Sequence, residues 1–294
     1  MSTERMQKRV CVETRAQLNA ALSAVSVDAV YLDACFFGAE EYARLAEEIR
    51  SRGKEAGLRF PQVWRTEAER YFTDHLAELK EAEFSLLLVR SMEGLLFLED
   101  AYLPLFGAAL TEAEKRPSGA DPSAVKRPRL VLDHSIYVSN GMTQDLIREL
   151  LPAHVRTLSL ELDRRELQAL VREESGPGME FELQVYGRVP MMISRQCVRH
   201  NTAGCSRQEE LLFLKDRKGA LMPVKNCCRF CFNTIYNSVP TLLYDLEKEI
   251  AEIAPDAVRY EFTTETGEEC SAILSGGLPP SGSFTRGHFR KSVD

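Results

Sequence analysis

The sequence predicts an α/β fold, a (β/α)8 barrel of the TIM type, and three observations support this prediction. Short apolar runs rich in β-branched and aromatic residues alternate with helix-like segments along the 294 residues, as parallel strands joined by helices do. One run, Phe84–Val89, is apolar throughout, which is typical of a strand buried on both faces. Eight such runs occur, the number that closes a barrel. We assign residues 1–274 to the barrel and 275–294 to a basic C-terminal tail.

The predicted strands share a short apolar stretch bounded by polar residues. In chain order they are Arg9–Glu13, Ala29–Asp33, Leu58–Trp64, Phe84–Val89, Arg129–His134, Arg156–Leu162, Glu180–Tyr186 and Val258–Phe262. Capping boxes at 66–69 and 163–166 predict the starts of two connecting helices. Another helix is predicted to begin near Thr143, and one more to carry Pro240 in its first turn. The segment 111–128 has three prolines and little hydrophobicity, so it is predicted to be an exposed insertion.

The composition, 44% hydrophobic and 28% charged with a net charge of −7, is that of a globular protein. The first residues form no apolar signal region, and no apolar run is long enough to span a membrane. We therefore expect a cytoplasmic protein without a membrane partner. In a reducing compartment, its cysteines would serve metal or redox chemistry rather than disulfides.

The segment 187–233, inserted after the seventh predicted strand, contains five of the eight cysteines. Four of these follow the spacing C-x7-C-x22-C-x2-C, namely Cys197, Cys205, Cys228 and Cys231. A C-x2-C step aims two thiolates at one point, and a second pair completes four-sulfur ligation of zinc or of a [4Fe–4S] cluster. The spacing does not distinguish the two metals. Cys227 could take the place of Cys228 in the set.

The same segment is basic, with nine Lys and Arg residues against three Asp and Glu residues. Positive charge lowers the pKa of metal-bound thiols, and it also attracts anionic partners such as RNA. We expect Arg188, Arg195 and Arg199 to face the mouth of the barrel for one of these two reasons.

Catalytic groups of this fold lie at the C-terminal ends of the strands. The polar and aromatic residues at or after the predicted strand ends are Glu13, Asp33, Cys35, Trp64, Arg90, His134, Glu161, Arg188 and Glu261. We predict His134 and Glu161 as a catalytic pair, because a histidine is the commonest proton carrier near neutral pH. Arg188, Arg195 and Glu261 are predicted to contact substrate.

The stretch YGRVPMMISRQCVRHNTAGC, followed by VKNCCRFCFNTIYNSVP, resembles the collagenase-like peptidase family of unassigned catalytic type. That family includes proteins acting in oxygen-independent hydroxylation of tRNA, ribosomal RNA and ubiquinone precursors. The resemblance extends to VDAVYLDACFF, LVLDHSIYVSN, LSLELDRRELQAL and the tail FTRGHFRKSVD. The family's usual alanine-proline-glycine turn after the first strand is missing. The chain therefore resembles the C-terminal half of a longer member, or a short homologue.

The resemblance implies that the four cysteines hold a [4Fe–4S] cluster, and it favours Cys228 over Cys227. In relatives of the ubiquinone branch a ligand comes from the loop after strand two, where Cys35 stands here. The implied function is hydroxylation of an RNA base or another aromatic substrate, with prephenate as a small-molecule oxygen donor. The alternatives are a peptidase, although neither HExxH nor GxSxG occurs, and a structural zinc-binding barrel.

Overall fold

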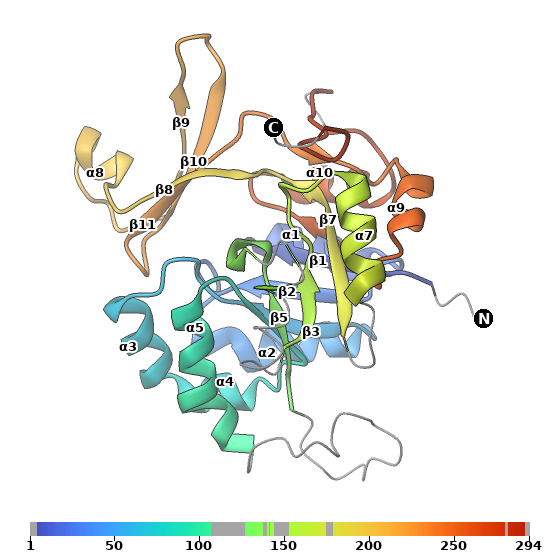
Figure 1. Ribbon diagram of the computed structural model, residues 1–294. Helices are drawn as coiled ribbons and strands as arrows, with labels where there is room; N and C mark the ends of the chain where they lie inside the picture. The colour runs from blue at the N-terminus through green and yellow to red at the C-terminus, as the bar shows by residue number, and fades with distance from the viewer. Residues whose placement is uncertain are drawn as a thin grey trace.

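The computed structural model describes residues 5–106, 127–137, 140, 142–143, 153–174, 179–279 and 282–291. Parallel strands pair in the order β7-β13-β1-β2-β3-β4-β5-β6, and β6 pairs in turn with β7, which closes an eight-stranded barrel (Figure 1). The strands are β1 Gln7–Val12, β2 Ala29–Asp33, β3 Glu55–Arg59, β4 Leu86–Val89, β5 Arg129–Leu132, β6 Ala153–Thr157, β7 Glu180–Gly187 and β13 Ala257–Glu261. The predicted TIM-like fold is confirmed.

Two predicted strands have the wrong bounds. The third strand ends at Arg59, and the apolar run that follows it leaves the sheet. There Trp64 stacks on Phe72, with ring centroids 5.2 Å apart, and also contacts Phe60 and Phe97. The sixth strand lies three residues earlier than its predicted start. In both cases apolar residues that favour a strand in the sequence lie instead in loops that pack around the barrel.

The helices of the described residues lie outside the strands. They are α1 Arg15–Ser23, α2 Ala39–Ser51, α3 Thr66–Asp74, α4 Leu76–Glu81, α5 Met92–Phe97, α7 Arg164–Glu174, α9 Glu247–Ile253 and α10 Gly267–Leu274, with short turns η1 Leu98–Tyr102, η2 Leu103–Phe106 and η4 His134–Ile136. The buried faces of these helices pack on the strands in one large hydrophobic cluster.

The capping prediction at 163–166 is confirmed, because Asp163 and Glu166 each accept a hydrogen bond from the other's backbone N–H. The prediction at Thr66 is wrong, since α3 is capped by Arg65 without a side-chain hydrogen bond. The helix expected from Pro240 begins only at Glu247, because β12 (Thr241–Leu242) first pairs antiparallel with β7. Residues 111–126, and most of the helix expected near Thr143, lie outside the described part of the chain.

The cysteine-rich insertion forms a second sheet rather than a loop. Its elements are β8 Pro190–Ser194, α8 Val198–Ala203, β9 Leu211–Lys215, β10 Leu221–Cys227 and β11 Phe232–Tyr236. The strands pair antiparallel in the order β8-β11-β10-β9, and in Figure 1 the β9–β10 hairpin projects away from the barrel. Phe230 attaches the sheet to α3 by stacking on Phe72, with ring centroids 5.8 Å apart.

The C-terminal tail packs back on the barrel. Thr285 bridges to Thr241 of β12, and the side chain of Phe289 is buried. Among the described residues no helix is long and apolar enough to cross a membrane.

Candidate functional site

The interior of the barrel at its C-terminal end is filled by buried charges rather than by branched apolar side chains. Arg259 of β13 lies 2.6 Å from Asp133, 2.9 Å from Glu182 and 3.3 Å from Glu261. Arg59 of β3 contacts Glu261 and lies 3.1 Å from Asp33. Each of these side chains is at most 3% exposed, so their interactions are weakly screened by water.

The pKa values of two acids in this network, Glu261 and Asp133, are lowered. Burial alone would raise the pKa of Glu261, but the attraction of Arg59 and Arg259 outweighs it and lowers the pKa. Asp133 is likewise held well below its usual range, because nearby positive groups such as Arg259 outweigh its burial. Both carboxylates are therefore ionised at neutral pH.

Glu13, at the end of β1, behaves differently. Burial raises its pKa to about 7, against the attraction of Lys225 and with a further increase from the nearby Asp33. Lys225 comes from β10 of the insertion and donates to Glu13 and to the carbonyl oxygen of Thr263, 2.8 Å away. Glu13 is thus a carboxyl group that can take up and release a proton near neutral pH.

His134, which follows β5, also lies at this end of the barrel. Burial lowers the pKa of His134, against the attraction of Asp133, whose Oδ2 lies 3.8 Å from the His134 Nε2 atom. Its predicted partner Glu161 is exposed, and among the described residues the Glu161 carboxylate makes no hydrogen bond or ion pair. The structure thus places His134 beside Asp133, not beside Glu161.

The predicted substrate arginines have structural partners. Arg188 donates to the carbonyl oxygens of Asn237 and Ser238 and to the Thr264 hydroxyl, 3.0 Å away. Arg195 pairs with Glu67 of α3 at 2.6 Å. Both contacts tie the insertion to the barrel, and a role of these arginines in substrate binding stays a prediction.

Arg199 and Arg229 of the insertion also bind partners within the chain. Arg199 pairs with Glu210 at 3.2 Å, and Arg229 donates to the carbonyl oxygens of Ala34 and Phe37. Much of the positive charge of the insertion therefore holds the insertion together and onto the barrel. The remaining exposed cations include those at the hairpin tip, Lys215, Arg217 and Lys218.

Two predicted metal ligands, Cys197 and Cys205, lie close enough to a third, Cys228, to affect its pKa. Burial raises the pKa of the Cys228 thiol, an Asn226 hydrogen bond lowers it, and the neighbouring Cys197 and Cys205 thiols raise it further. The Asn226 amide nitrogen lies 3.2 Å from the Cys228 sulfur, and so does the carbonyl oxygen of Gln208, to which the same amide donates.

Cys231 follows in the turn between β10 and β11, where it is exposed and has a left-handed backbone with φ of 55°. Within the described part of the chain, no group of three Cys, His, Asp or Glu side chains is arranged to hold a metal ion. The four-sulfur site therefore stays a prediction. The donor set suits a soft metal centre, because sulfur is a soft ligand and the amide that donates to the Cys228 sulfur favours the thiolate form of that residue.

The structure separates Cys227 from this group. Neighbouring residues of a strand point to opposite faces, so Cys227 shares the barrel-facing side of β10 with Lys225, while Asn226 faces outward. The Cys227 sulfur lies 3.9 Å from the carbonyl oxygen of Cys35, and burial, followed by Cys227, raises the pKa of Cys35. The remaining cysteines, Cys11 and Cys270, are buried elsewhere.

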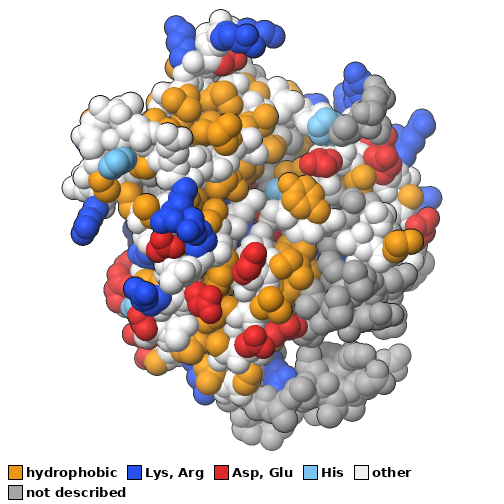
Figure 2. Space-filling view, turned by 60° about the vertical axis from the view of Figure 1, so that its left-hand side comes forward, with side chains coloured by type: hydrophobic (Ala, Val, Ile, Leu, Met, Phe, Trp, Pro, Cys, Tyr) orange, Lys and Arg blue, Asp and Glu red, His pale blue; other side chains and the backbone are white. Residues whose placement is uncertain are grey.

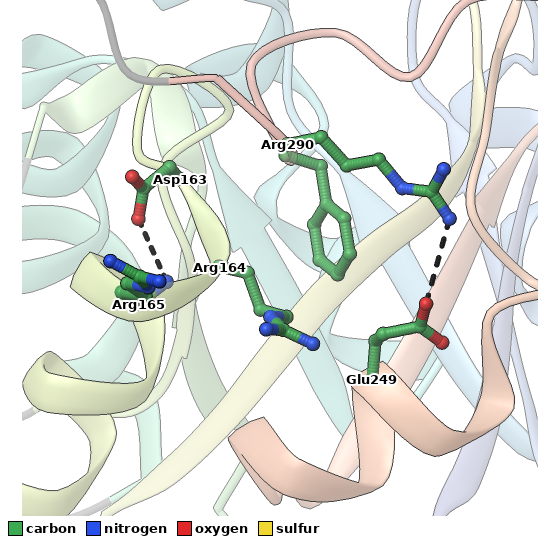
Figure 3. A pocket seen from close by; sticks show the side chains of 6 residues that line it. Asp163, Arg164, Arg165, Glu249 and Arg290 are labelled. Carbon is green, nitrogen blue, oxygen red and sulfur yellow. Dashed lines mark hydrogen bonds and ion pairs between the residues drawn. The ribbon is translucent and has the colours of Figure 1, made fainter.

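A cavity of about 530 Å³ lies between the first turns of α7 and α9 and the C-terminal tail (Figure 3). Its lining residues are Asp163, Arg164, Arg165, Glu249, Phe289 and Arg290. Arg290 pairs with Glu249 at 3.5 Å and Arg164 with Glu252 at 3.3 Å. None of the residues predicted as functional lines this cavity, and its charges are largely paired, so we assign it no function.

The sequence analysis missed Arg59, Arg259 and Lys225 as parts of the charged network. A signal for Arg259 was present: Arg259 and Glu261 are two positions apart in a predicted strand and so share one face. Two charges on one face of an otherwise apolar strand indicate a polar barrel interior. The partners of Lys225 could not be inferred, because they are about 40 and 210 residues away in the sequence.

No family model matches the chain, and no curated protein matches it either. Several solved structures are similar in part. A putative copper homeostasis protein CutC from Streptococcus agalactiae has a TM-score of 0.40 and 15% identity, covering 61% of this chain and 88% of that one. An uncharacterized B. cereus protein has a TM-score of 0.43 and 6% identity, covering 92% and 65% of the two chains.

A xylose isomerase-like TIM barrel/4-hydroxyphenylpyruvate dioxygenase fusion protein has a TM-score of 0.40 and 13% identity, covering 92% of this chain and 42% of that one. These similarities are too weak to transfer any property. The barrel assignment rests on the strand pairings of the chain itself.

Proposed function

We propose that this chain is an iron–sulfur protein that acts in oxygen-independent hydroxylation of an RNA base or another aromatic ring. The proposal rests on the family resemblance of the cysteine segment. The observation that carries it is the position of the Cys228 thiol, which has Cys197 and Cys205 as neighbours and an amide donor at its sulfur.

The proposed cluster ligands are Cys197, Cys205, Cys228 and Cys231. Cys35 and Cys227 are left out of the set, because they approach each other on the opposite face of the insertion sheet. A cluster bound by Cys197, Cys205, Cys228 and Cys231 would supply one-electron transfer.

The residues of the barrel end have separate roles in this proposal. Glu13 and His134 carry protons: the pKa of Glu13 is about 7, and His134 lies at the same end of the barrel, with its Nε2 atom 3.8 Å from Asp133. Arg90 would bind an anionic oxygen donor: within the described residues its Nε atom makes no hydrogen bond, and its ion pair with Asp133 is long, at 3.6 Å. Prephenate, the donor that the resemblance implies, carries carboxylates that an arginine can bind.

The metal content tests the first part of the proposal. Protein purified without oxygen should contain iron and sulfide and show broad visible absorption. Cys228→Ala should lose both, whereas Cys227→Ala, the adjacent cysteine on the other face, should keep them. A colourless protein that contains zinc would indicate a structural zinc barrel instead.

The reaction is tested in cells that lack this protein and are complemented with variants. Mass spectrometry of RNA should show a hydroxylated base with the wild type and its loss with Cys228→Ala, His134→Ala and Glu13→Gln. Glu161→Gln should retain the modification, because its carboxylate is exposed and unpaired. Peptide cleavage that survives Cys228→Ala, with no change in RNA, would establish the peptidase alternative.

A further inference from the structure

The β9–β10 hairpin combines a basic tip with exposed apolar side chains. Figure 2 shows a hydrophobic patch directly below a group of Lys and Arg side chains at the top of the molecule. The exposed large hydrophobic residues of the insertion are Met191, Met192, Leu211, Phe213, Leu214 and Leu221, and they are between 37% and 58% exposed. A patch of this kind on a globular protein marks an interaction surface.

Strand β9 forms one edge of the insertion sheet, because its one partner among the described strands is β10. Its sequence is LLFLK, so both faces of the strand are apolar: Leu212 and Leu214 lie on one face, and Leu211 and Phe213 on the other. Proteins usually protect such edges with lysine, proline or a bulge in the strand. Here the charge comes only at the last residue, and the edge is open for pairing with another strand.

The charges that flank β9 favour a second copy of the same strand as the partner. Glu209 precedes the strand, whereas Lys215, Arg217 and Lys218 lie at its end and in the turn that follows; Glu210 already pairs with Arg199 of the same chain. Two copies that pair antiparallel therefore bring the acidic end of each strand to the basic end of the other. Two other partners fit this surface less well. A lipid bilayer would have to accommodate the charged hairpin tip. RNA would bind the basic tip but leave the leucines and Phe213 uncovered.

We propose that β9 pairs antiparallel with β9 of a second copy of this chain about a two-fold axis close to Phe213. The interface is isologous, so each subunit contributes the same strand, and the two four-stranded sheets become continuous. Pairing covers the apolar edge and satisfies its free backbone groups. The contact lies beside the thiol group, because Gln208, three residues before β9, contacts Cys228. It does not depend on a bound metal.

The first experiment measures molar mass by light scattering and sedimentation over a wide range of protein concentrations. The wild type should form a dimer. Phe213→Lys should weaken dimerisation about a hundredfold or more, since like charges across an interface cost several kcal/mol. The control Val25→Lys, at a 97% exposed position in the loop between α1 and β2, should dimerise as the wild type does. A wild type that is monomeric throughout, or a Phe213→Lys variant that dimerises normally, would overturn the proposal.

Charge exchange tests the antiparallel arrangement with variants whose folding is checked by circular dichroism. About an axis at Phe213, Glu209 of each copy faces Arg217 of the other, so Glu209→Lys and Arg217→Glu should each weaken the dimer about tenfold, and the double variant should restore it. Dimerisation that none of the three changes affects would rule this arrangement out.

Cross-linking gives an independent result even if a charge variant misfolds. Opposite Cα atoms of antiparallel strands lie about 4.5–5.5 Å apart, within the range of a disulfide. Mild oxidation of Phe213→Cys should therefore give a covalent dimer above the wild-type background, whereas Val25→Cys should not. The absence of this additional dimer would contradict the proposed axis.

Discussion

The barrel buries arginine and glutamate side chains, whereas the hairpin of the insertion exposes leucine, methionine and phenylalanine. Inside the barrel, buried charges of opposite sign meet, as for Arg259 with its three carboxylates. On the hairpin, Phe213 is 54% exposed and its strand pairs on one side. The barrel end is therefore complete within one chain, while the hairpin has the properties of a surface that another chain covers.

This comparison also separates the two cysteine environments. Cys227 lies on the side of the insertion that closes onto the barrel, with Cys35 as its neighbour. Cys228 lies with the outer thiols. Two adjacent residues of the same type thus belong to different parts of the molecule, because a strand alternates its faces.

The largest effect is expected from Arg259→Ala, which removes the central cation of the barrel. Asp133, Glu182 and Glu261 would lose their shared partner in a buried environment, and breaking a buried pair costs about 3–5 kcal/mol of unfolding free energy. Urea denaturation measures this loss. The control Arg44→Ala removes an exposed pair with Glu41 and should cost about 1 kcal/mol or less. Equal losses in the two variants would show that the network does not stabilise the barrel.

Phe230→Ala tests how the insertion is held on the barrel. Phe230 is 2% exposed and contacts Phe72 and Tyr71, so its removal leaves a cavity and should cost about 3 kcal/mol. Limited proteolysis should then cut within 190–236 before it cuts the barrel. The exposed Leu96 is the control, and Leu96→Ala should change neither stability nor cleavage appreciably. Cleavage that begins in the barrel would mean that the insertion is not the less stable part.

A smaller effect is expected from the pH dependence of Glu13→Gln. The folded protein keeps the Glu13 proton up to pH about 7, whereas the unfolded chain releases it near 4.5. Between these values the folded state binds more protons, so this contribution to stability is complete below pH 4.5 and is lost as the pH rises through 7.

Glutamine does not ionise, so the Glu13→Gln variant does not lose this stability as the pH rises. The stability of the variant relative to the wild type should therefore rise between pH 4.5 and 8 by on the order of 3 kcal/mol at most. Urea denaturation at several pH values measures the difference. Glu161→Gln, at an exposed carboxylate, should keep the wild-type slope, and the same slope in Glu13→Gln would show that Glu13 is an ordinary carboxylate.

The sequence by itself determined the barrel and the place of the insertion. Alternation of apolar runs with helical segments is a local signal, because side-chain direction repeats every two residues in a strand and every 3.6 in a helix. The cap at Asp163 was readable for the same reason, since its partner Glu166 lies three residues away. Strand bounds were less certain: apolar residues such as Trp64 serve equally well in a strand or in a loop that packs on a helix.

Only the tertiary structure decided which charges meet. Arg59 and Glu261 are 202 residues apart and become neighbours because β3 and β13 belong to one closed sheet. The packing of the insertion sheet on the barrel brings Lys225 to Glu13, 212 residues away, whereas His134 lies beside its neighbour in the chain, Asp133, and the Glu161 carboxylate is exposed. These contacts depend on how the strands are ordered and how far each is shifted against the next. Local sequence patterns do not encode that information, because each residue type is compatible with many distant partners.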